Sequence, residues 1–472
     1  MGLIVLSLTQ LIVVLDGTIV TIALPDAQQD LGLTDGQRQW VVTAYALAFG
    51  ALLLIGGRVA DYWGRKKAFI VGLVGFGLAS FLGGIAPNGA DLILARALQG
   101  LFAALLAPSS LALLTVSFPS GRERNTAFAV FGSVAGAGSA LGLVLGGLLT
   151  ELANWRWCLF VNIFFVAAGI IGGIFFITGS KTEGKSRYDL WGVITVTLGL
   201  GALVYGFTLA EKGWTRLDTL GFLALGIGFL VMFVWVQTRA TSPLLPLRII
   251  RHRVRGSAFF IQAVAGSVAI GGTVFMSYHL QVVLMMSPLQ AGLASLPFTL
   301  STLSAAPLAT KALQRYGPRP LLVTGPLIVA LGLLHLSGIT ATGTYLQQVL
   351  PGFIIIGIGM AAVYVPLQNL ALAGVAAQDS GVAGAASTSM MQIGGSVGLS
   401  VFTAVAAASY GTVLLADGAL APASLTQGYS AAFIAAAAGM ALAGAVAAAF
   451  LRGRDGNPGN PKTEQKEAME VG

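Results

Sequence analysis

The segment LDGTIVTIALP (residues 15–25) decides how the chain is interpreted, because it places one carboxylate inside a long apolar run. The run begins at Leu3 and continues to Pro25, and Asp16 is its one charged residue. An ionised side chain at membrane depth is costly, and such residues mark routes for ions, protons or substrates. Asp16 is therefore the first candidate functional residue.

The composition indicates a polytopic membrane protein. Of the 472 residues, 56% are hydrophobic and only 9% are charged, whereas about a quarter of the residues of a soluble domain are charged. The single cysteine, Cys158, excludes an internal disulfide and any cysteine-based metal cluster. The first apolar run has no basic segment before it and carries Asp16 in its middle, so we expect it to remain as a span instead of being removed as a signal peptide.

The apolar runs are long enough for fourteen membrane-spanning helices, since a span needs about 20 mainly apolar residues. The predicted spans are 3–25, 38–60, 67–86, 91–117, 125–150, 157–178, 189–210, 219–238, 255–283, 290–313, 319–338, 346–374, 381–409 and 428–451.

The lysines and arginines set the orientation of these spans. With the N-terminus in the cytoplasm, 21 of the 26 bases fall in inner segments, four fall in outer segments, and Arg96 lies within a span. Such a bias follows the rule that cytoplasmic loops are enriched in Lys and Arg. We expect both termini to be cytoplasmic, and we expect no nucleic-acid partner, because the net charge of +8 is explained by topology.

A weak internal repeat divides the spans into two sets of six. The turn GRVADYWGRKK (57–67) and the turn TKALQRYGPR (310–319) both place an aromatic residue before a glycine, with a base following. We therefore predict an N-terminal six-helix bundle (1–180), two additional spans (181–238), a basic cytoplasmic linker (239–254), a C-terminal six-helix bundle (255–451) and a disordered cytoplasmic tail (452–472). Repeated halves with a site near the bilayer midplane are typical of secondary transporters.

Arg96 is predicted to lie at the same depth as Asp16. At 1.5 Å per residue, Asp16 is about 20 Å from the inner end of its span and Arg96 is about 8 Å from the outer end of span 91–117. Burial favours the neutral acid, and a nearby arginine favours the carboxylate. A change in their separation would therefore change the proton affinity, which is the minimum requirement for proton coupling; the alternative is a static salt bridge that joins two helices.

Two further motifs are candidates for a conformational role. In the turn at 57–67, Asp61 is an acid among bases, which we expect to cap a helix or to pair with a base across the half; the alternative is an ordinary basic loop. Span 125–150 carries glycines at four-residue spacing, a pattern that admits a neighbouring helix closely, and plain packing is the favoured interpretation of it. Span 381–409 carries a similar series of glycines, which predicts a paired interface of the two halves. These two motifs comprise Gly57, Asp61, Gly64, Arg65, Lys66, Gly138, Gly142, Gly146 and Gly147.

These motifs together resemble those of the major facilitator superfamily, and within it the fourteen-span drug:proton antiporters. The resemblance includes DGTIVTIALP from Asp16, GRVADYWGRK from Gly57, LARALQG around Arg96, the glycine stripe of span 125–150, WRW with Asn162, SPLQAG from Ser287 and GPR from Gly317. It covers about residues 15 to 400. It implies an all-α integral membrane protein with the major facilitator fold, in which two six-helix bundles flank two extra helices.

The sequence departs from the family pattern in two places. Leu143 stands where the motif of helix five has proline, which removes a potential kink and puts the gating role of that motif in doubt here. Span 290–313 has no acid, whereas some relatives that export divalent cationic drugs carry one in a second-half helix. We therefore expect neutral or monocationic substrates.

Polar and aromatic residues inside the spans are candidates for the substrate cavity, although aromatic residues more often serve packing. They are Trp40, Tyr45, Gln99, Gln262, Phe275, Tyr278, Tyr364, Gln368, Asn369, Met391 and Gln392. Histidines can titrate near neutral pH, but we interpret His279 and His335 as core or interfacial histidines with satisfied hydrogen bonds.

No enzymatic constellation is present in the sequence, and we expect a transporter. The chain has one Cys, three dispersed His and no Gly-x4-Gly-Lys-Ser/Thr phosphate loop, so we expect no metal, no cofactor and no ATP-driven step. The resemblance implies export of hydrophobic or cationic small molecules, such as drugs and antibiotics, across a bacterial inner membrane by a monomer that uses the proton motive force. The alternatives are a transporter of one metabolite (a siderophore, amino acid or lipid precursor) and a non-transporting receptor.

Overall fold

The computed structural model describes residues 1–118, 121–177, 189–210, 213–240, 243–245, 247, 250, 252–372, 380–410 and 421–451, without the side chains of a few helical residues. The predicted tail and parts of the predicted linker lie outside these ranges. The elements are α1 (Gly2–Leu31), α2 (Asp35–Trp63), α3 (Arg65–Gly84), α4 (Gly89–Ser117), α5 (Gly121–Leu152), α6 (Trp157–Phe176), α7 (Leu190–Leu209), α8 (Leu217–Arg239), α10 (Arg253–Ser267), η2 (Val268–Gly272), α11 (Thr273–Tyr278), η3 (His279–Val283), α12 (Pro288–Tyr316), α13 (Pro318–Leu336), η4 (Tyr345–Val349), α14 (Leu350–Leu372), α15 (Ser380–Ser409) and α16 (Pro422–Phe450).

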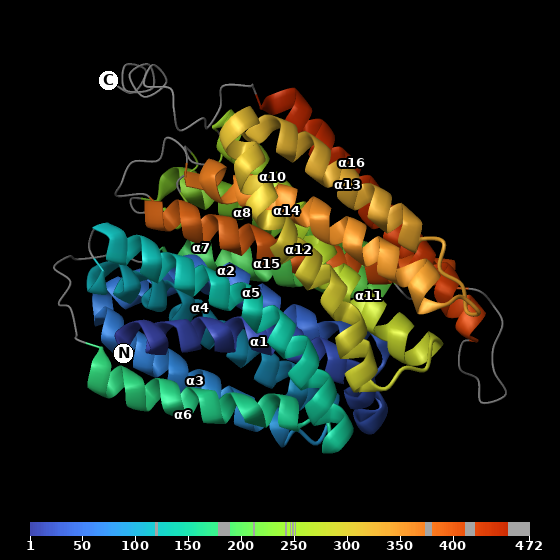
Figure 1. Ribbon diagram of the computed structural model, residues 1–472, viewed down its shortest axis with the longest axis horizontal. Helices are drawn as coiled ribbons and strands as arrows, with labels where there is room; N and C mark the ends of the chain where they lie inside the picture. The colour runs from blue at the N-terminus through green and yellow to red at the C-terminus, as the bar shows by residue number, and fades with distance from the viewer. Residues whose placement is uncertain are drawn as a thin grey trace.

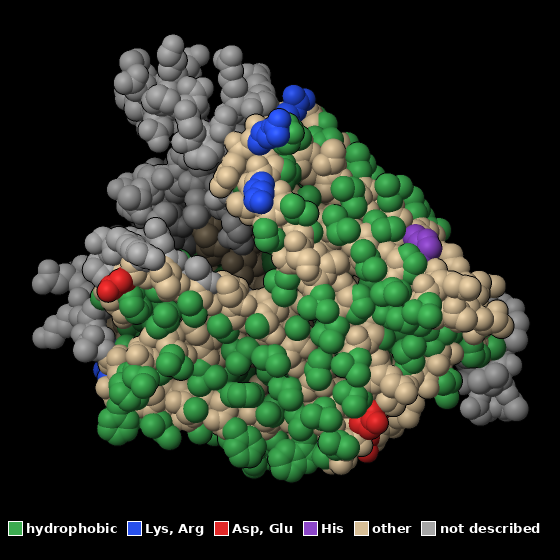
Figure 2. Space-filling view, viewed as in Figure 1, with side chains coloured by type: hydrophobic (Ala, Val, Ile, Leu, Met, Phe, Trp, Pro, Cys, Tyr) green, Lys and Arg blue, Asp and Glu red, His purple; other side chains and the backbone are tan. Residues whose placement is uncertain are grey.

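Fourteen helical segments within the described ranges are long and apolar enough to cross a membrane, which confirms the predicted number. Several run past the predicted bounds; the first, for example, continues to Leu31. The ninth span is one continuous path in which the π-helices η2 and η3 interrupt the α-helix. Figure 2 shows hydrophobic side chains over the broad face of the molecule and charged side chains near its margins, as expected for a surface that meets lipid.

The helices pack in two groups whose internal contacts repeat (Figure 1). In the first group α1 packs on α5 and α6, α2 packs on α4, and α3 packs on α4 and α6; in the second, α10 packs on α15 and α16, α12 on α14, and α13 on α14 and α16. The groups meet through α2 with α15 and through α5 with α12, and α7 lies against both α2 and α15. The weak sequence repeat thus corresponds to a repeated packing scheme.

The two repeated turns share a glycine for a backbone reason. Gly64 has φ of 96° and Gly317 has φ of 77°, conformations that residues with a Cβ atom adopt rarely. Both turns lie at the same end of the helices, which we call the basic end. We call the opposite end, with the turns after Leu31 and Val283, the far end. There the capping boxes Thr34–Gln37 and Ser287–Gln290 begin helices α2 and α12.

The described polar contacts between the two groups concentrate at the far end. Ser277 donates to the carbonyl of Thr21 at 3.0 Å, and the hydroxyl of Tyr278 donates to Gln28 Oε1 at 2.7 Å. The guanidinium of Arg38 lies 4.2 Å from the centre of the Tyr278 ring. Helix α1 therefore contacts the second group near the far end.

Candidate functional site

Asp16 is fully buried and accepts three hydrogen bonds from side chains of two other helices. Arg96 Nη1 on α4 lies 2.6 Å from its Oδ2, while Gln99 Nε2 on α4 and Asn162 Nδ2 on α6 lie 3.0 and 2.7 Å from its Oδ1. The exposed fractions of Asp16 and Arg96 are 0% and 1%. The structure thus brings together the acid and the base that the sequence placed at one depth.

Arg96 has backbone, side-chain and ring contacts besides its ion pair with Asp16. Its Nε donates to the carbonyl of Val41 at 3.1 Å, and its Nη1 also donates to Gln99 Oε1 at 2.8 Å. The ring centre of Tyr45 lies 4.4 Å from the guanidinium carbon, and the Tyr45 hydroxyl in turn donates to the carbonyl of Val13. A buried ion pair is retained only when such additional hydrogen bonds offset desolvation, and this pair has them.

Five helices of the first group contribute to this cluster. Besides α1, α2, α4 and α6, α3 supplies Ser80, whose Oγ accepts from Gln99 Nε2 at 2.8 Å. Asn162 and Ser80 were not among the predicted site residues. Asn162 offered a signal, a lone amide in an apolar run. Ser80 offered none, because a serine in a membrane helix commonly bonds to its own helix backbone.

Chemically, the cluster surrounds a buried acid with hydrogen-bond donors. Hydrogen bonds to a charged group are stronger than neutral ones, so the three donors tie Asp16 of α1 to α4 and α6. A proton that binds Asp16 removes the charge that Arg96 neutralises and leaves the buried guanidinium to be satisfied by Val41, Gln99 and the Tyr45 ring. Protonation of the acid therefore changes the forces between α1 and α4.

The turn between α2 and α3 forms local contacts. Asp61 Oδ1 near the end of α2 and Arg65 Nε at the start of α3 lie 3.1 Å apart and are partly exposed. Lys66 Nζ donates to the carbonyl of Ile174 on α6. Gly64 adopts its positive φ here, and a Cβ at Gly57 would lie against Pro108 at 3.6 Å. The pair described for Asp61 is with Arg65 of the same motif, whereas a helix cap or a base across the half was expected.

The glycine stripe of α5 receives α1. A Cβ at Gly138 would lie against Leu11 and Val14, one at Gly142 would overlap Thr18, and one at Gly146 would lie 2.8 Å from the carbonyl of Ile19.

In α15, Gly394 and Gly398 stand against Ala263 and Ser267 of α10 in the same way. The expectation that the two stripes form a paired interface of the halves is wrong, because each stripe admits the first helix of its own group.

The opposite side of α5 faces the second group instead. Gly147 lies against the backbone of Pro288 and Leu289, and the carbonyl of Leu143 lies where a Cβ of Gly292 would be. Leu143, which replaces the motif proline, is buried at 3% exposure. This face of α5 is a close backbone contact between the two groups.

The predicted cavity residues fall in separate places. Tyr45 and Gln99 belong to the Asp16 cluster. Trp40 donates to Thr208 of α7 at 3.1 Å. Phe275 packs edge-on against Tyr429, 5.5 Å between ring centres.

The other predicted cavity residues lie on helices of the second group, and among them Tyr278 takes part in the far-end contacts. Gln262 is buried and its Oε1 has no hydrogen-bond partner. Tyr364, Met391 and Gln392 are partly buried on α14 and α15. The side chains of Gln368 and Asn369 lie outside the described residues.

The interpretation of the histidines is wrong for His279. This residue is fully buried, its ring centre lies 6.5 Å from that of Tyr429, and neither ring nitrogen has a hydrogen-bond partner. His335 is exposed near the end of α13. The predicted burial of a histidine is thus found at His279, but the predicted hydrogen bonds of its ring are not.

The chain matches known proteins along most of its length. The model of the Major Facilitator Superfamily matches residues 6–399 and 258–470. A puromycin resistance protein of Streptomyces alboniger is 44% identical over 433 residues, which are 90% of this chain and 85% of that protein. A cephamycin export protein of Amycolatopsis lactamdurans is 37% identical over 403 residues, 84% of this chain and 82% of that protein.

Two further matches extend this result. A tetracenomycin C resistance and export protein of Streptomyces glaucescens is 34% identical over 406 residues, 85% of this chain and 75% of that protein. The crystal structure of a peptide transporter in complex with sulfate superposes with a TM-score of 0.68 over 95% of this chain and 94% of that chain, at 16% identity. At that identity the structural match shows the fold alone.

Fold and sequence together define a multi-pass membrane transporter, not an enzyme. The chain belongs to the major facilitator superfamily, which confirms the resemblance found in its motifs.

Proposed function

We propose that this protein is a proton-coupled antiporter that exports hydrophobic or cationic small molecules, antibiotics among them, by alternating access. The support for an export substrate of this kind is the naming of its relatives for resistance to, or export of, puromycin, tetracenomycin C and cephamycin. We further propose that it works as a monomer in the bacterial cytoplasmic membrane, with the basic end and both termini in the cytoplasm, as the bias of Lys and Arg favours.

The observation that carries proton coupling is the burial of Asp16 among Arg96, Gln99 and Asn162. A fixed structural link between helices would be served as well by apolar packing, since replacing a buried ion pair by hydrophobic residues is often neutral or stabilising. In this proposal Asp16 exchanges protons with the two sides of the membrane in turn. The distance between Arg96 and Asp16 sets the proton affinity of Asp16.

Helix α1 links this chemistry to the movement of the two groups. Asp16 lies five residues before Thr21 and six before Ile22, whose carbonyls accept hydrogen bonds from Ser277 and Gln281 of the second group. A shift of α1 relative to α4 on protonation therefore acts on the far-end contacts within two helical turns. In this way the binding of a proton to Asp16 shifts the equilibrium between the state open to the outside and the state open to the cytoplasm.

The energy available suits an exporter. One proton that moves inward through about 100 mV releases about 2.3 kcal/mol. With 1.4 kcal/mol for each factor of ten, this supports a roughly fifty-fold substrate gradient. A pH gradient adds to it.

The function is tested with the purified protein in detergent and with a strain that produces it. We expect puromycin or another antibiotic of a varied panel to release protons from the purified protein, and we expect Asp16→Asn to release none. Production of the protein should raise resistance to the same compound. Release that is equal in Asp16→Asn would refute the assignment of the proton site.

A narrower substrate range is the second candidate, because each of these relatives carries the name of one compound. Binding measured across antibiotics and across a metabolite panel of siderophores, amino acids and lipid precursors separates the two. Binding of several unrelated antibiotics supports the broad exporter, and binding confined to one metabolite supports the narrow one.

A further inference from the structure

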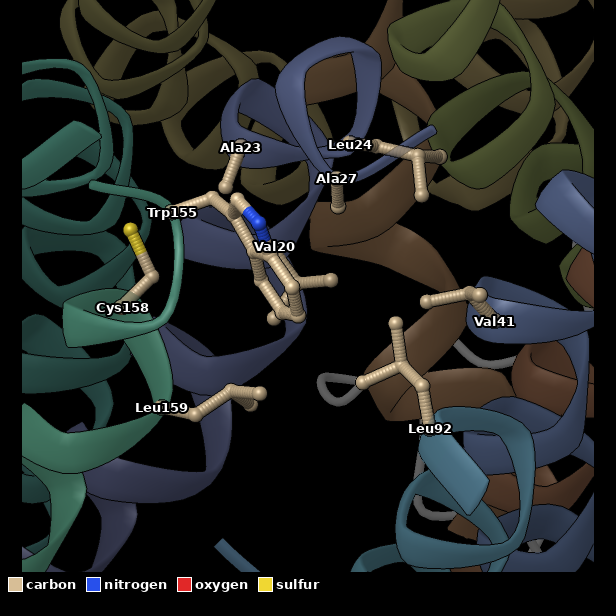
Figure 3. A pocket seen from close by; sticks show the side chains of 9 residues that line it. All are labelled: Val20, Ala23, Leu24, Ala27, Val41, Leu92, Trp155, Cys158 and Leu159. Atoms are coloured by element: carbon tan, nitrogen blue, oxygen red, sulfur yellow. The ribbon is translucent and has the colours of Figure 1, made fainter. Parts of the chain in front are cut away.

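A small apolar cavity lies inside the first group, between the helices that hold Asp16 (Figure 3). Its volume is about 10 Å³. The residues that line it are all buried, with exposed fractions of 6% or less: Val20, Ala23, Leu24, Ala27, Val41, Leu92, Trp155, Cys158 and Leu159. The cavity is thus enclosed by α1, α2, α4, α6 and the turn before α6.

The register of the lining residues places this cavity one helical turn from the Asp16 cluster, on its far-end side. Val20 follows Asp16 by four residues on α1, and Leu92 precedes Arg96 by four on α4. Residues four apart lie on one face of a helix. On α6, Leu159 precedes Asn162 by three residues.

The backbone of α2 adds a direct link between the cavity and the cluster. Val41 lines the cavity with its side chain, and its carbonyl accepts the Nε of Arg96 at 3.1 Å. The wall residue Val41 therefore joins the inner end of this cavity to the Asp16 cluster through its backbone carbonyl.

The outer end of the cavity meets a charged group at the far end. Trp155 lines the cavity and its Nε1 donates to Asp30 Oδ2 at 3.0 Å. Arg156 Nη2 lies 2.9 Å from the same oxygen, and half of the Asp30 side chain is exposed. Asp30 lies about 21 Å along α1 from Asp16, and Ala23 and Ala27 of the cavity wall lie between them.

The wall of the cavity presents mainly apolar side chains and offers water few partners. The two side-chain polar groups in its wall are engaged elsewhere: Trp155 with Asp30, and Cys158 Sγ with Thr150 Oγ1 at 3.4 Å and the carbonyl of Gly146. A volume of about 10 Å³ is at the lower limit for one water, and a water needs two to four polar partners. The segment is therefore a dry interruption between the exposed Asp30 and the buried Asp16.

We propose that this cavity is the closed segment of a proton route that runs from the far end to Asp16 within the first group, separate from the space between the two groups. The proposal rests on the proposed function. When the helices around the cavity separate enough to admit water, a hydronium ion gives its proton to an Asp16 oxygen and leaves as water. The titratable and charged groups that the structure places along this route are Asp30 and Arg156 at its outer end, Cys158 in its wall, and Arg96 beside Tyr45 at its inner end.

The test adds one hydroxyl to the wall of the cavity and measures proton leak into proteoliposomes of the full chain, without substrate, with an internal pH dye. Val20→Thr preserves shape and supplies a partner for water. We expect its leak to be roughly fivefold that of the unchanged protein, the effect of about one hydrogen bond. Val41→Thr places a hydroxyl in the wall from α2 and should act in the same direction.

The same helix provides a matched control. Val13 has the same exposed fraction as Val20, 6%, and lies on the other side of Asp16, three residues before it. Val13→Thr should leak like the unchanged protein. Ala27→Val fills the cavity, so adding it to Val20→Thr should return the leak to the level of the unchanged protein. Adding Asp16→Asn to Val20→Thr should have the same effect.

Other results would overturn the route. The route is overturned if Val20→Thr and Val41→Thr both leak no faster than the unchanged protein. It is overturned as well if Val13→Thr raises the leak as much as Val20→Thr does, or if the raised leak of Val20→Thr persists when Asp16→Asn is added. Failure of the proposed function is distinguishable, since it shows as uphill export by Asp16→Asn with Val20 unchanged.

Discussion

Arg96 Nη1 and Asp16 Oδ2 lie 2.6 Å apart inside the first group of helices, and both side chains are at most 1% exposed. Every described partner of this pair comes from α2, α4 or α6. The acid thus lies within one bundle, and in the proposed mechanism it acts on the boundary between the groups through α1.

The energetic coupling of Asp16 and Arg96 can be measured by a double-mutant cycle. Arg96→Gln leaves a buried acid without its base and should lower the free energy of unfolding by about 3 kcal/mol. The double variant Asp16→Asn, Arg96→Gln should lie within about 1 kcal/mol of the unchanged protein, because neither charge remains. Thermal unfolding in detergent with a bound dye provides the comparison of both single variants with the double variant. A loss in the double variant equal to the sum of the two single losses would show that the pair is not coupled.

Asn162 is expected to contribute to stability through its contact with Asp16. Its amide donates to Asp16 Oδ1 at 2.7 Å, and a hydrogen bond to a charged group is worth about 1.5–3 kcal/mol. Asn162→Leu leaves the buried acid without this donor, so it should lower the free energy of unfolding in detergent by about 2 kcal/mol.

Ser80→Ala is the control for this loss, since Ser80 contacts Gln99 and not Asp16. Its free energy of unfolding should fall less than half as far. If the two variants lose equal stability, the direct contact of Asn162 with Asp16 is not the cause of the loss.

The packing of α1 into α5 predicts opposite effects at two glycines of one helix. A Cβ at Gly142 would overlap Thr18, two residues from Asp16, while a Cβ at Gly132 meets nothing within 4 Å. Gly142→Ala should destabilise the protein by about 1–3 kcal/mol and reduce coupled transport. Gly132→Ala should be neutral or stabilise it by up to about 1 kcal/mol. Similar unfolding temperatures for the two variants would refute this account of the stripe.

Contacts of Tyr278 are expected to hold the far end closed. Tyr278→Phe removes the hydrogen bond to Gln28, worth about 1 kcal/mol or roughly a fivefold shift in equilibrium. Spin labels at Gln29 and Met285, both exposed, in a Cys158→Ser background should show a larger fraction of long distances.

Tyr345→Phe is the matched control, because its hydroxyl bonds to Ala294 within the second group. It should leave the distance distribution unchanged. A Tyr278→Phe distribution identical to that of the control would show that the contact does not hold the gate.

The sequence predicted the architecture and the central pair for physical reasons. Fourteen apolar runs and the distribution of Lys and Arg determine the number of spans, and depth along α1 and α4 places Asp16 level with Arg96. Local chemistry also explains the shared glycine of the two turns, because the positive φ at Gly64 and Gly317 requires it.

Side-chain partners were predicted less well, because membrane helices carry apolar residues on all faces. Hydropathy then does not reveal which face meets which helix, so the stripe of α5 was assigned to the wrong neighbour. For the same reason Tyr45 and Gln99 were assigned to a substrate cavity although they surround Asp16. Ser80 and the unpaired ring of His279 depend on tertiary packing, which a pattern along one helix does not contain.

The central claim is that Asp16 couples export to the proton gradient, and transport by Asp16→Asn in proteoliposomes with an imposed pH gradient tests it most directly. We predict that this variant loses gradient-driven accumulation of substrate while it retains downhill exchange, since the amide fits the site but does not titrate. Uphill accumulation by Asp16→Asn at the rate of the unchanged protein would contradict the account.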